Sequence, residues 1–320
     1  MDKKPNLLIY QDLIEPISDA IYELQEIADN YKQEPPSADY VNKGVFAYVI
    51  ALLEGSVTEC VERYLFSFPE KLPKVKIESE KYMSEISDTD FSYELIALLI
   101  REYLIENSYE NGGLMLQKYC QLLGVTNLSP LFNKKLNEKK ARRNSLIHNN
   151  LKVDSKYIRT AKGDPRNKGK YMRVRPVYVI ETVEAALEIL KKLESELDAK
   201  YGSYTILKAV KDVWAYIFQS AIMKFDDYWG VNGDMLYIKT EGIKKYYKSL
   251  SSGEKTLLFY FIQNYNPGAC EKLFKFHDLN MQVSNNHQMI FLVSVFDRFP
   301  LLLQNLKSIQ PASFFKYVSE

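Results

Sequence analysis

The apolar residues near the start of the chain recur every three or four positions, which is the spacing of a helix with one buried face. This spacing is followed by Leu13, Ile14, Ile17, Ile21, Leu24 and Ile27. Pro35-Pro36-Ser37 then predicts the end of that helix and the start of a second one, over about residues 39–65. Because the same period returns along most of the chain, the pattern predicts an all-α fold.

Turn and capping residues indicate where the next helices begin and end. Pro69 and Pro73 lie in a charged stretch that predicts a loop over residues 68–81. Ser129-Pro130 predicts the start of a helix, because serine accepts hydrogen bonds from free backbone amides and proline is tolerated in the first turn. Asn149-Asn150 predicts the end of the same helix. These signals together predict helices over about residues 88–106, 112–123 and 130–149.

The predicted helix over residues 130–149 mixes apolar and basic side chains. We expect its apolar side chains to face the bundle and its lysines to lie outside. The apolar positions are Leu131, Phe132, Leu136, Leu146 and Ile147.

The length of 320 residues predicts about two domains. Residues 170–180 have β-branched and aromatic character and predict a short strand or hairpin arm, and residues 181–201 predict a long closing helix. We therefore predict a helical bundle over residues 1–201 with a short β-arm insertion, followed by a helical C-terminal domain over residues 202–320 whose role the sequence does not indicate.

Two segments of the predicted C-terminal domain superficially resemble ligand sites. The aromatic residues in 213–218 are more typical of a helix core than of a cofactor pocket. Residues 251–256 contain Gly253 and Lys255, but Glu254 interrupts the order that a phosphate-binding loop requires. Ser251 with Glu254 instead predicts a capping box that opens a helix over residues 255–263.

Composition and targeting signals indicate a cytoplasmic protein. The longest apolar run, residues 45–53, is far shorter than the ~20 residues that a membrane span needs, and no signal-peptide core follows the first residues. Cys60, Cys120 and Cys270 are odd in number and widely separated, which is typical of small core residues in a reducing compartment. His277 and His287 match no zinc-site spacing, so we expect no metal.

Charge is distributed unevenly, although the net charge is only +1. Residues 1–130 hold 11 Lys and Arg against 22 Asp and Glu, whereas residues 131–175 hold 15 against 3. Such a basic segment predicts a polyanionic partner, and Tyr157 and Tyr171 within it could stack on unpaired bases. The alternative is that the segment pairs with the acidic N-terminal region of its own chain. The residues expected to bind RNA are Lys139, Lys140, Arg142, Arg159, Lys170, Arg173 and Arg175.

One short motif in this basic segment carries the chemistry for cleaving RNA. Arg143 and His148 are separated by four residues, and Asn144 directly follows the arginine. An imidazole can remove a proton from the ribose 2′-OH near neutral pH, and a guanidinium can stabilise the charge that develops on the phosphoryl oxygens. No metal or other cofactor is needed for this reaction.

Helix geometry limits how the two catalytic groups can meet. Residues five apart point roughly 140° away from each other, whereas Asn144 and His148, four apart, lie one above the other. Either Arg143 curls back towards His148, or the motif meets a second copy of itself across a two-fold axis.

Residues 143–148 resemble the R-x4-6-H signature of HEPN domains (higher eukaryotes and prokaryotes nucleotide-binding), including the polar residue after the arginine. The resemblance covers at most about the first 200 residues. It implies a helical bundle that forms a homodimer, brings both motifs into a shared cleft, and acts as a metal-independent endoribonuclease in toxin or antiviral defence systems. An antitoxin or another regulatory protein is a further partner of this kind of ribonuclease.

Residues 45–55 resemble the apolar helix from which several HEPN ribonucleases place an acidic residue against the catalytic arginine. Glu54 is that residue here, and pairing with Arg143 would offset the cost of burying a lone carboxylate. The alternative is a Glu54 that faces solvent.

Two other interpretations of the motif remain open. The bundle can be a non-catalytic module that binds RNA or a partner, with the motif only stabilising a dimer. It can also be a toxin controlled by a nucleotidyltransferase antitoxin, but such toxins carry a tyrosine two residues after the histidine, where this chain has Asn150.

Overall fold

The computed structural model describes residues 8–74, 92–110, 112–125, 130–218, 221–232, 235–239, 245–250 and 258. Within these residues the fold is predominantly helical, as predicted. The chain divides into two units. One contains residues 10–74 and 98–203, and the other contains the described residues from Tyr204 onwards together with residues 8–9 and 92–97. The interpretation of these parts as domains with separate roles stays a prediction.

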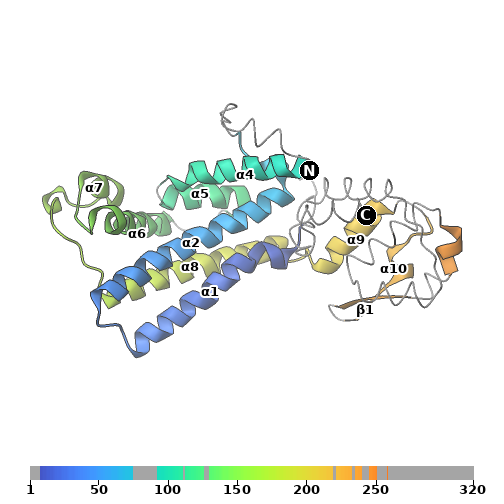
Figure 1. The fold of residues 1–320 in the computed structure, drawn as a ribbon, viewed down its shortest axis with the longest axis horizontal. Helices are drawn as coiled ribbons and strands as arrows, with labels where there is room; N and C mark the ends of the chain where they lie inside the picture. Colours follow the sequence, from blue (N-terminus) through green and yellow to red (C-terminus); the bar gives the residue numbers. More distant parts are fainter. Residues whose placement is uncertain are drawn as a thin grey trace, which may run out of the picture. The chain divides into compact units, whose positions relative to one another are not determined.

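Three long helices form the centre of the first unit. They are α1 (Tyr10–Gln33), α2 (Asp39–Ser67) and α8 (Pro176–Tyr201). Each packs against the other two, and they run side by side in Figure 1. Leu24 of α1 and Leu193 of α8 are fully buried in this layer, so the helical period of the apolar residues correctly predicted the core.

Two further helices cover α2 beside this layer. They are α5 (Gly112–Leu123) and α6 (Pro130–Asn149), which pack against each other and against α2. Both helices have the bounds that were predicted, residues 112–123 and 130–149, and His148 lies in the last turn of α6. Helix α4 (Ser92–Ser108) precedes α5 in the chain. After α2, the chain forms the short helix η1 (Pro69–Lys71), and the rest of the predicted loop after residue 74 lies outside the described residues.

Helix α2 is long and apolar enough, by length and composition alone, to cross a membrane. It contacts α1, α8, α5 and α6, and its Glu54 forms ion pairs with two side chains of α6. These contacts account for its apolar character as that of a core helix in a bundle.

A small insertion connects α6 to α8. It contains α7 (Ser155–Ala161) and η2 (Pro165–Asn167). Its two ends are joined by backbone hydrogen bonds, including Val153 N to Lys170 O at 2.9 Å and Gly169 N to Val153 O at 2.8 Å. We call residues 152–175 the basic insertion.

The predicted β-arm over residues 170–180 was mostly wrong. Only Tyr171 forms a β-bridge, with Lys152, and α8 already begins at Pro176. Proline fits the first turn of a helix, where its missing amide hydrogen is not needed, so this residue overrides the β-branched character of the residues around it.

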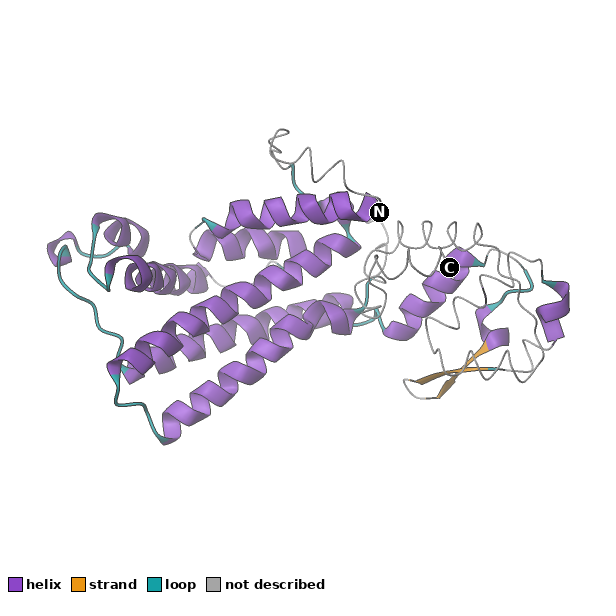
Figure 2. Cartoon of the chain, viewed as in Figure 1, coloured by secondary structure: helices purple, strands orange, loops and turns teal. Residues whose placement is uncertain are grey.

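The second unit contains an element that the sequence did not predict. Besides α9 (Ile206–Ile217) and the short α10 (Phe225–Tyr228), it has an antiparallel hairpin of β1 (Trp229–Asn232) and β2 (Met235–Ile238). Figure 2 shows the hairpin in orange. The short helix η3 follows at residues 247–249. The predicted helical C-terminal domain thus has a short hairpin among its described residues, and its extent as a domain stays a prediction.

The aromatic residues of this unit form a core, as expected. Trp214 is fully buried and donates a hydrogen bond from Nε1 to Met223 O at 2.7 Å. Its ring contacts those of Phe218, Phe225 and Tyr228. The predicted capping box at residues 251–254, nearly all of the helix over 255–263, and Cys270, His277 and His287 lie outside the described residues.

The contact between α5 and α6 leaves no space for a side chain at Gly112. An added Cβ would lie 2.9 Å from Leu136 Cγ and 3.3 Å from Lys140 Cδ. We expect Gly112→Ala to lower the free energy of unfolding by about 1–3 kcal/mol through overpacking, measured by urea denaturation.

Gly44 in α2 is the matched control, because an added Cβ there meets no atom within 4 Å. Gly44→Ala should be neutral or stabilise the protein by up to about 1 kcal/mol, since alanine favours helix. Equal destabilisation by both substitutions would contradict the close packing of α5 on α6.

Candidate functional site

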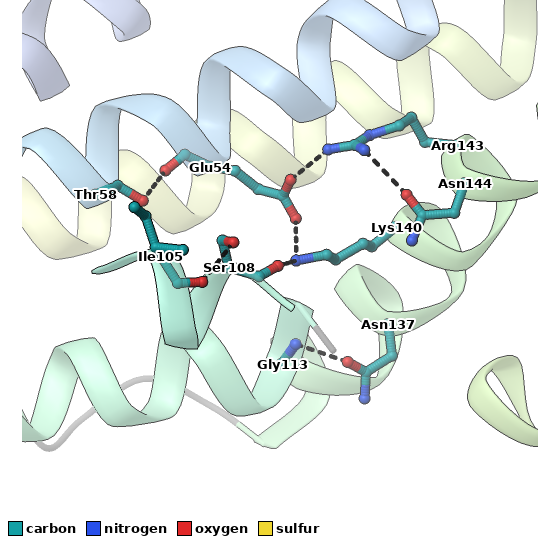
Figure 3. A network of polar contacts seen from close by, with 9 residues as sticks. All are labelled: Glu54, Thr58, Ile105, Ser108, Gly113, Asn137, Lys140, Arg143 and Asn144. Carbon is teal, nitrogen blue, oxygen red and sulfur yellow. Dashed lines mark hydrogen bonds and ion pairs between the residues drawn. The ribbon is translucent and has the colours of Figure 1, made fainter. Parts of the chain in front are cut away.

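A buried carboxylate on α2 holds two cations of α6. Glu54 Oε2 lies 2.6 Å from Arg143 Nη2, and Glu54 Oε1 lies 3.0 Å from Lys140 Nζ. Figure 3 shows both α6 side chains reaching towards Glu54. The Glu54 side chain is only 13% exposed, so the prediction that it pairs with Arg143 is confirmed and the solvent-facing alternative is wrong.

The network carries more positive than negative charge. One carboxylate is shared by Arg143 and Lys140, whose side chains are 22% and 9% exposed. Lys140 also donates to the backbone oxygen of Ser108 at 3.3 Å, which adds only a neutral partner. Because charges interact more strongly in a partly buried site than in water, the uncompensated charge would favour a bound anion.

Arg143 keeps donors beyond those that bind Glu54. Its Nη1 donates to Asn144 Oδ1 at 3.0 Å, whereas its Nε is buried and has no acceptor among the described residues. Asn144 therefore touches Arg143 directly and helps to orient the guanidinium plane.

His148 is exposed to solvent at the end of α6. No hydrogen bond or ion pair joins it to Arg143 in the part of the chain that the structure describes. Arg143 reaches towards α2, and the five-residue spacing directs the two side chains roughly 140° apart. The structure thus gives an accessible imidazole and an anchored guanidinium on one helix, without contact within the chain.

The end of α6 is firmly capped just after His148. Leu151 N donates to Ser145 O at 3.0 Å, and Ser145 Oγ donates to Lys152 O at 3.0 Å. Asn150 and Leu151 have φ angles of 46° and 62°, the left-handed conformation that ends many helices. Asn150 is thus part of this helix cap.

A second polar cluster lies on α6 around Glu138. Its carboxylate accepts hydrogen bonds from Arg142 Nε at 2.8 Å, Tyr157 Oη at 2.7 Å and Tyr178 Oη at 2.5 Å. Arg142 also stacks on the Tyr178 ring, 4.0 Å from its centroid. Burial, together with the hydrogen bond to Glu138, raises the pKa of Tyr157 to about 12. This cluster joins α6 to both α7 and α8.

Several basic residues expected on the surface are buried. Lys139 and Lys140 are each 7% exposed, while Ile147, which was expected to face the bundle, is 57% exposed. Lys139 Nζ donates to Thr182 Oγ1 at 3.0 Å, and Arg142 is engaged by Glu138. These three basic residues therefore support the structure of the bundle, and the expectation that the lysines of α6 lie outside is wrong for Lys139 and Lys140. The assignment of all three to RNA binding stays a prediction. Leu136 is buried as predicted, and the side chains of Leu131 and Phe132 lie outside the described residues.

The remaining residues expected to bind RNA do lie on the surface. Arg159, Lys170, Arg173 and Arg175 are all exposed in the basic insertion, and their role in RNA binding stays a prediction. Tyr171 is 67% exposed. Tyr157, by contrast, is held by Glu138, so it is less suited to stack on a base.

Sequence reasoning missed the structural roles of Lys140, Glu138 and Tyr178. A signal for one of them was present: Glu138 is four residues before Arg142, the spacing of an ion pair along a helix. The partners from α2 and α8 are distant in sequence, and no local pattern indicates them.

Comparison of the chain with protein-family models, curated proteins and solved structures finds no match. Within the described residues, no group of three or more His, Cys, Asp or Glu side chains is placed to hold a metal ion. The residues whose geometry indicates a function are therefore Glu54, Arg143, Asn144 and His148.

Removing the Glu54 carboxylate should destabilise the bundle strongly. We expect Glu54→Ala to lower the free energy of unfolding by about 3–5 kcal/mol, because Arg143 and Lys140 would lose their shared partner in a mostly buried site. Adding Lys140→Met should recover part of this loss, since one unpaired cation disappears.

The control for this experiment is the exposed pair of Asp39 and Lys43, in which Asp39 is 66% exposed. Asp39→Asn should change stability by less than about 1 kcal/mol. Urea denaturation of the wild type and these variants measures the effects. Destabilisation by Glu54→Ala no greater than that by Asp39→Asn would show that the network contributes little.

Proposed function

We propose that this protein is a metal-independent endoribonuclease of the HEPN type, acting in toxin or antiviral defence in the cytoplasm. The observation that carries the proposal is the guanidinium of Arg143, which Glu54 and Asn144 hold at the edge of the bundle, on the helix that ends with an exposed His148.

In the proposed reaction, His148 removes the proton from a ribose 2′-OH. The 2′ oxygen attacks the adjacent phosphorus, the bond from phosphorus to the 5′ oxygen breaks, and the leaving oxygen takes up the proton that His148 accepted. The products are a 2′,3′-cyclic phosphate and a 5′-OH. Arg143 stabilises the charge on the phosphoryl oxygens, Asn144 orients the phosphate or ribose, and Glu54 positions Arg143.

The active site is proposed to be shared between two copies of the chain. Because Arg143 reaches towards Glu54 on α2 and His148 is exposed at the end of α6, convergence on one phosphate is simpler when the histidine comes from a second copy. A two-fold axis brings two such pairs together at once.

A second function is favoured by one observation. Glu54 already neutralises part of the charge of Arg143, which is also what a purely structural arginine would require. The alternative is therefore a non-catalytic module that binds RNA or a protein partner, with the motif stabilising the dimer.

Cleavage of RNA by the purified protein distinguishes these functions. We expect cleavage in EDTA, with 2′,3′-cyclic phosphate ends detected by their resistance to poly(A) tailing until the phosphate is removed. His148→Ala should lower the rate by about 10²- to 10⁴-fold through loss of the general base. Arg143→Ala should lower it by about 10²- to 10³-fold through loss of charge stabilisation.

Lys191→Ala, at an exposed position of α8, should leave the rate unchanged. Complete loss of cleavage in EDTA, or full activity of His148→Ala, would reject the mechanism. A wild-type protein that binds RNA and never cleaves it would favour the non-catalytic function.

Mixing two inactive variants tests the shared site. In a heterodimer of Arg143→Ala and His148→Ala, one of the two composite sites retains both groups and the other has neither. When the variants are refolded together, about half of the dimers are mixed, so the mixture should regain about a quarter of the wild-type activity. A mixture as inactive as each variant alone would show that both groups act within one chain.

A further inference from the structure

The basic insertion is a folded surface with a large excess of positive charge. Residues 152–175 contain nine Lys and Arg against two Asp. All nine of the basic residues are exposed: Lys152, Lys156, Arg159, Lys162, Arg166, Lys168, Lys170, Arg173 and Arg175.

The two aspartates of the insertion have local structural roles. Asp154 caps α7 by accepting a hydrogen bond from Tyr157 N at 2.7 Å. Asp164 accepts from Arg166 N at 2.9 Å and pairs with the Arg166 side chain at 2.6 Å. They therefore compensate little of the positive charge, and within the described residues the ion pair of Asp164 with Arg166 is the one that the insertion forms with an acid.

The charged residues are held on a defined scaffold. Leu151, Val153 and Val174 are buried at the base of the insertion, where the backbone bonds to Lys170 and Gly169 close it. The hydrogen bond from Tyr157 to Glu138 joins α7 to α6, the helix that contains Arg143 and His148. A ligand would therefore meet a surface that is already ordered, which lowers the entropy cost of binding.

Tyr171 adds an aromatic ring to this charged surface. It is 67% exposed, follows Lys170 and precedes Arg173 by two residues. Bases of a single strand can stack on such a ring, whereas the bases of a duplex are already stacked on one another.

We propose that the basic insertion is a binding surface for single-stranded RNA, separate from the side chains that carry out cleavage. That the bound strand is then cleaved rests on the proposed function. The insertion begins four residues after His148, and the capped end of α6 fixes the direction in which it leaves the helix. A strand bound to the insertion is therefore held next to the exposed imidazole.

Binding is tested with the full chain carrying His148→Ala, so that the RNA stays intact. The probes are a labelled, unstructured RNA of about 20 nucleotides and a labelled duplex RNA of the same length. Fluorescence anisotropy measures the affinity of the protein for each probe between about 50 and 200 mM salt. Each phosphate bound on a single strand contributes about −0.7 to the slope of log K against log salt.

The variant that tests the charge combines Lys156→Gln, Arg159→Gln, Lys168→Gln and Arg173→Gln. We expect it to bind the single strand at least about tenfold more weakly, with a slope less steep by about 0.7 for each phosphate that is no longer neutralised. The control neutralises four exposed lysines elsewhere and should bind as before. It combines Lys32→Gln, Lys191→Gln, Lys224→Gln and Lys248→Gln.

The variant that tests stacking is Tyr171→Ala. It should weaken binding of the single strand by about 5- to 150-fold and leave duplex binding unchanged. Tyr22→Ala is its control, because Tyr22 is 73% exposed on α1. Both substituted tyrosines are exposed, and circular dichroism confirms that each variant is folded. Should the fourfold variant not fold, the pair Arg159→Gln and Arg173→Gln replaces it.

Three outcomes would overturn the inference. The first is equal affinity of the fourfold variant and its control for the single-stranded RNA, and the second is equal affinity of the protein for duplex and single strand with no effect of Tyr171→Ala. The third is a fourfold variant in which only the salt dependence of the protein's self-association changes. The last would assign the insertion to the acidic surface of a second copy. If the wild-type chain binds the RNA and does not cleave it, the proposed ribonuclease function is rejected and the proposed RNA-binding surface is retained.

Discussion

The sharing of Glu54 between Arg143 and Lys140 is the constraint on which the site depends. A carboxylate on an apolar core helix is costly to bury alone, so it fixes the position of the helix that supplies its cations. Two cations on one carboxylate also prevent full neutralisation of either. The same ion pair thus stabilises the packing of α6 on α2 and leaves the guanidinium with capacity for an anion.

The period of 3.6 residues per turn places the structural side chains of α6 and its accessible side chains on different parts of the helix surface. Arg142 and Arg143 are adjacent in sequence but lie about 100° apart around the helix axis, so one joins the Glu138 cluster and the other joins Glu54. In the last turn the helix projects beyond these contacts, and Ile147 and His148 are exposed. The basic character that looks uniform in the sequence is therefore divided between a scaffold and a surface.

The features that were predicted correctly from the sequence are those that neighbouring residues determine. The helix periods, the bounds of α5 and α6, and the pairing of Glu54 were correct, because each follows from nearby residues or from the cost of one buried charge. The burial of Lys139 and Lys140 was missed, since long aliphatic stems let a lysine cross an apolar contact and reach a polar group on another helix. The hairpin of β1 and β2 was overlooked although its pairing is local and Gly233-Asp234 between the two strands is a sequence signal for a hairpin turn.

The closure of the basic insertion at its base has a consequence for how this chain can diversify. Residues 153 and 169 are bonded to each other through their backbones, so the intervening residues leave and re-enter the bundle at one point. A tip of different length or composition would not alter the spacing between α6 and α8. The charge and shape of this surface can therefore change by exchange of that tip, while α6 keeps its register against α2.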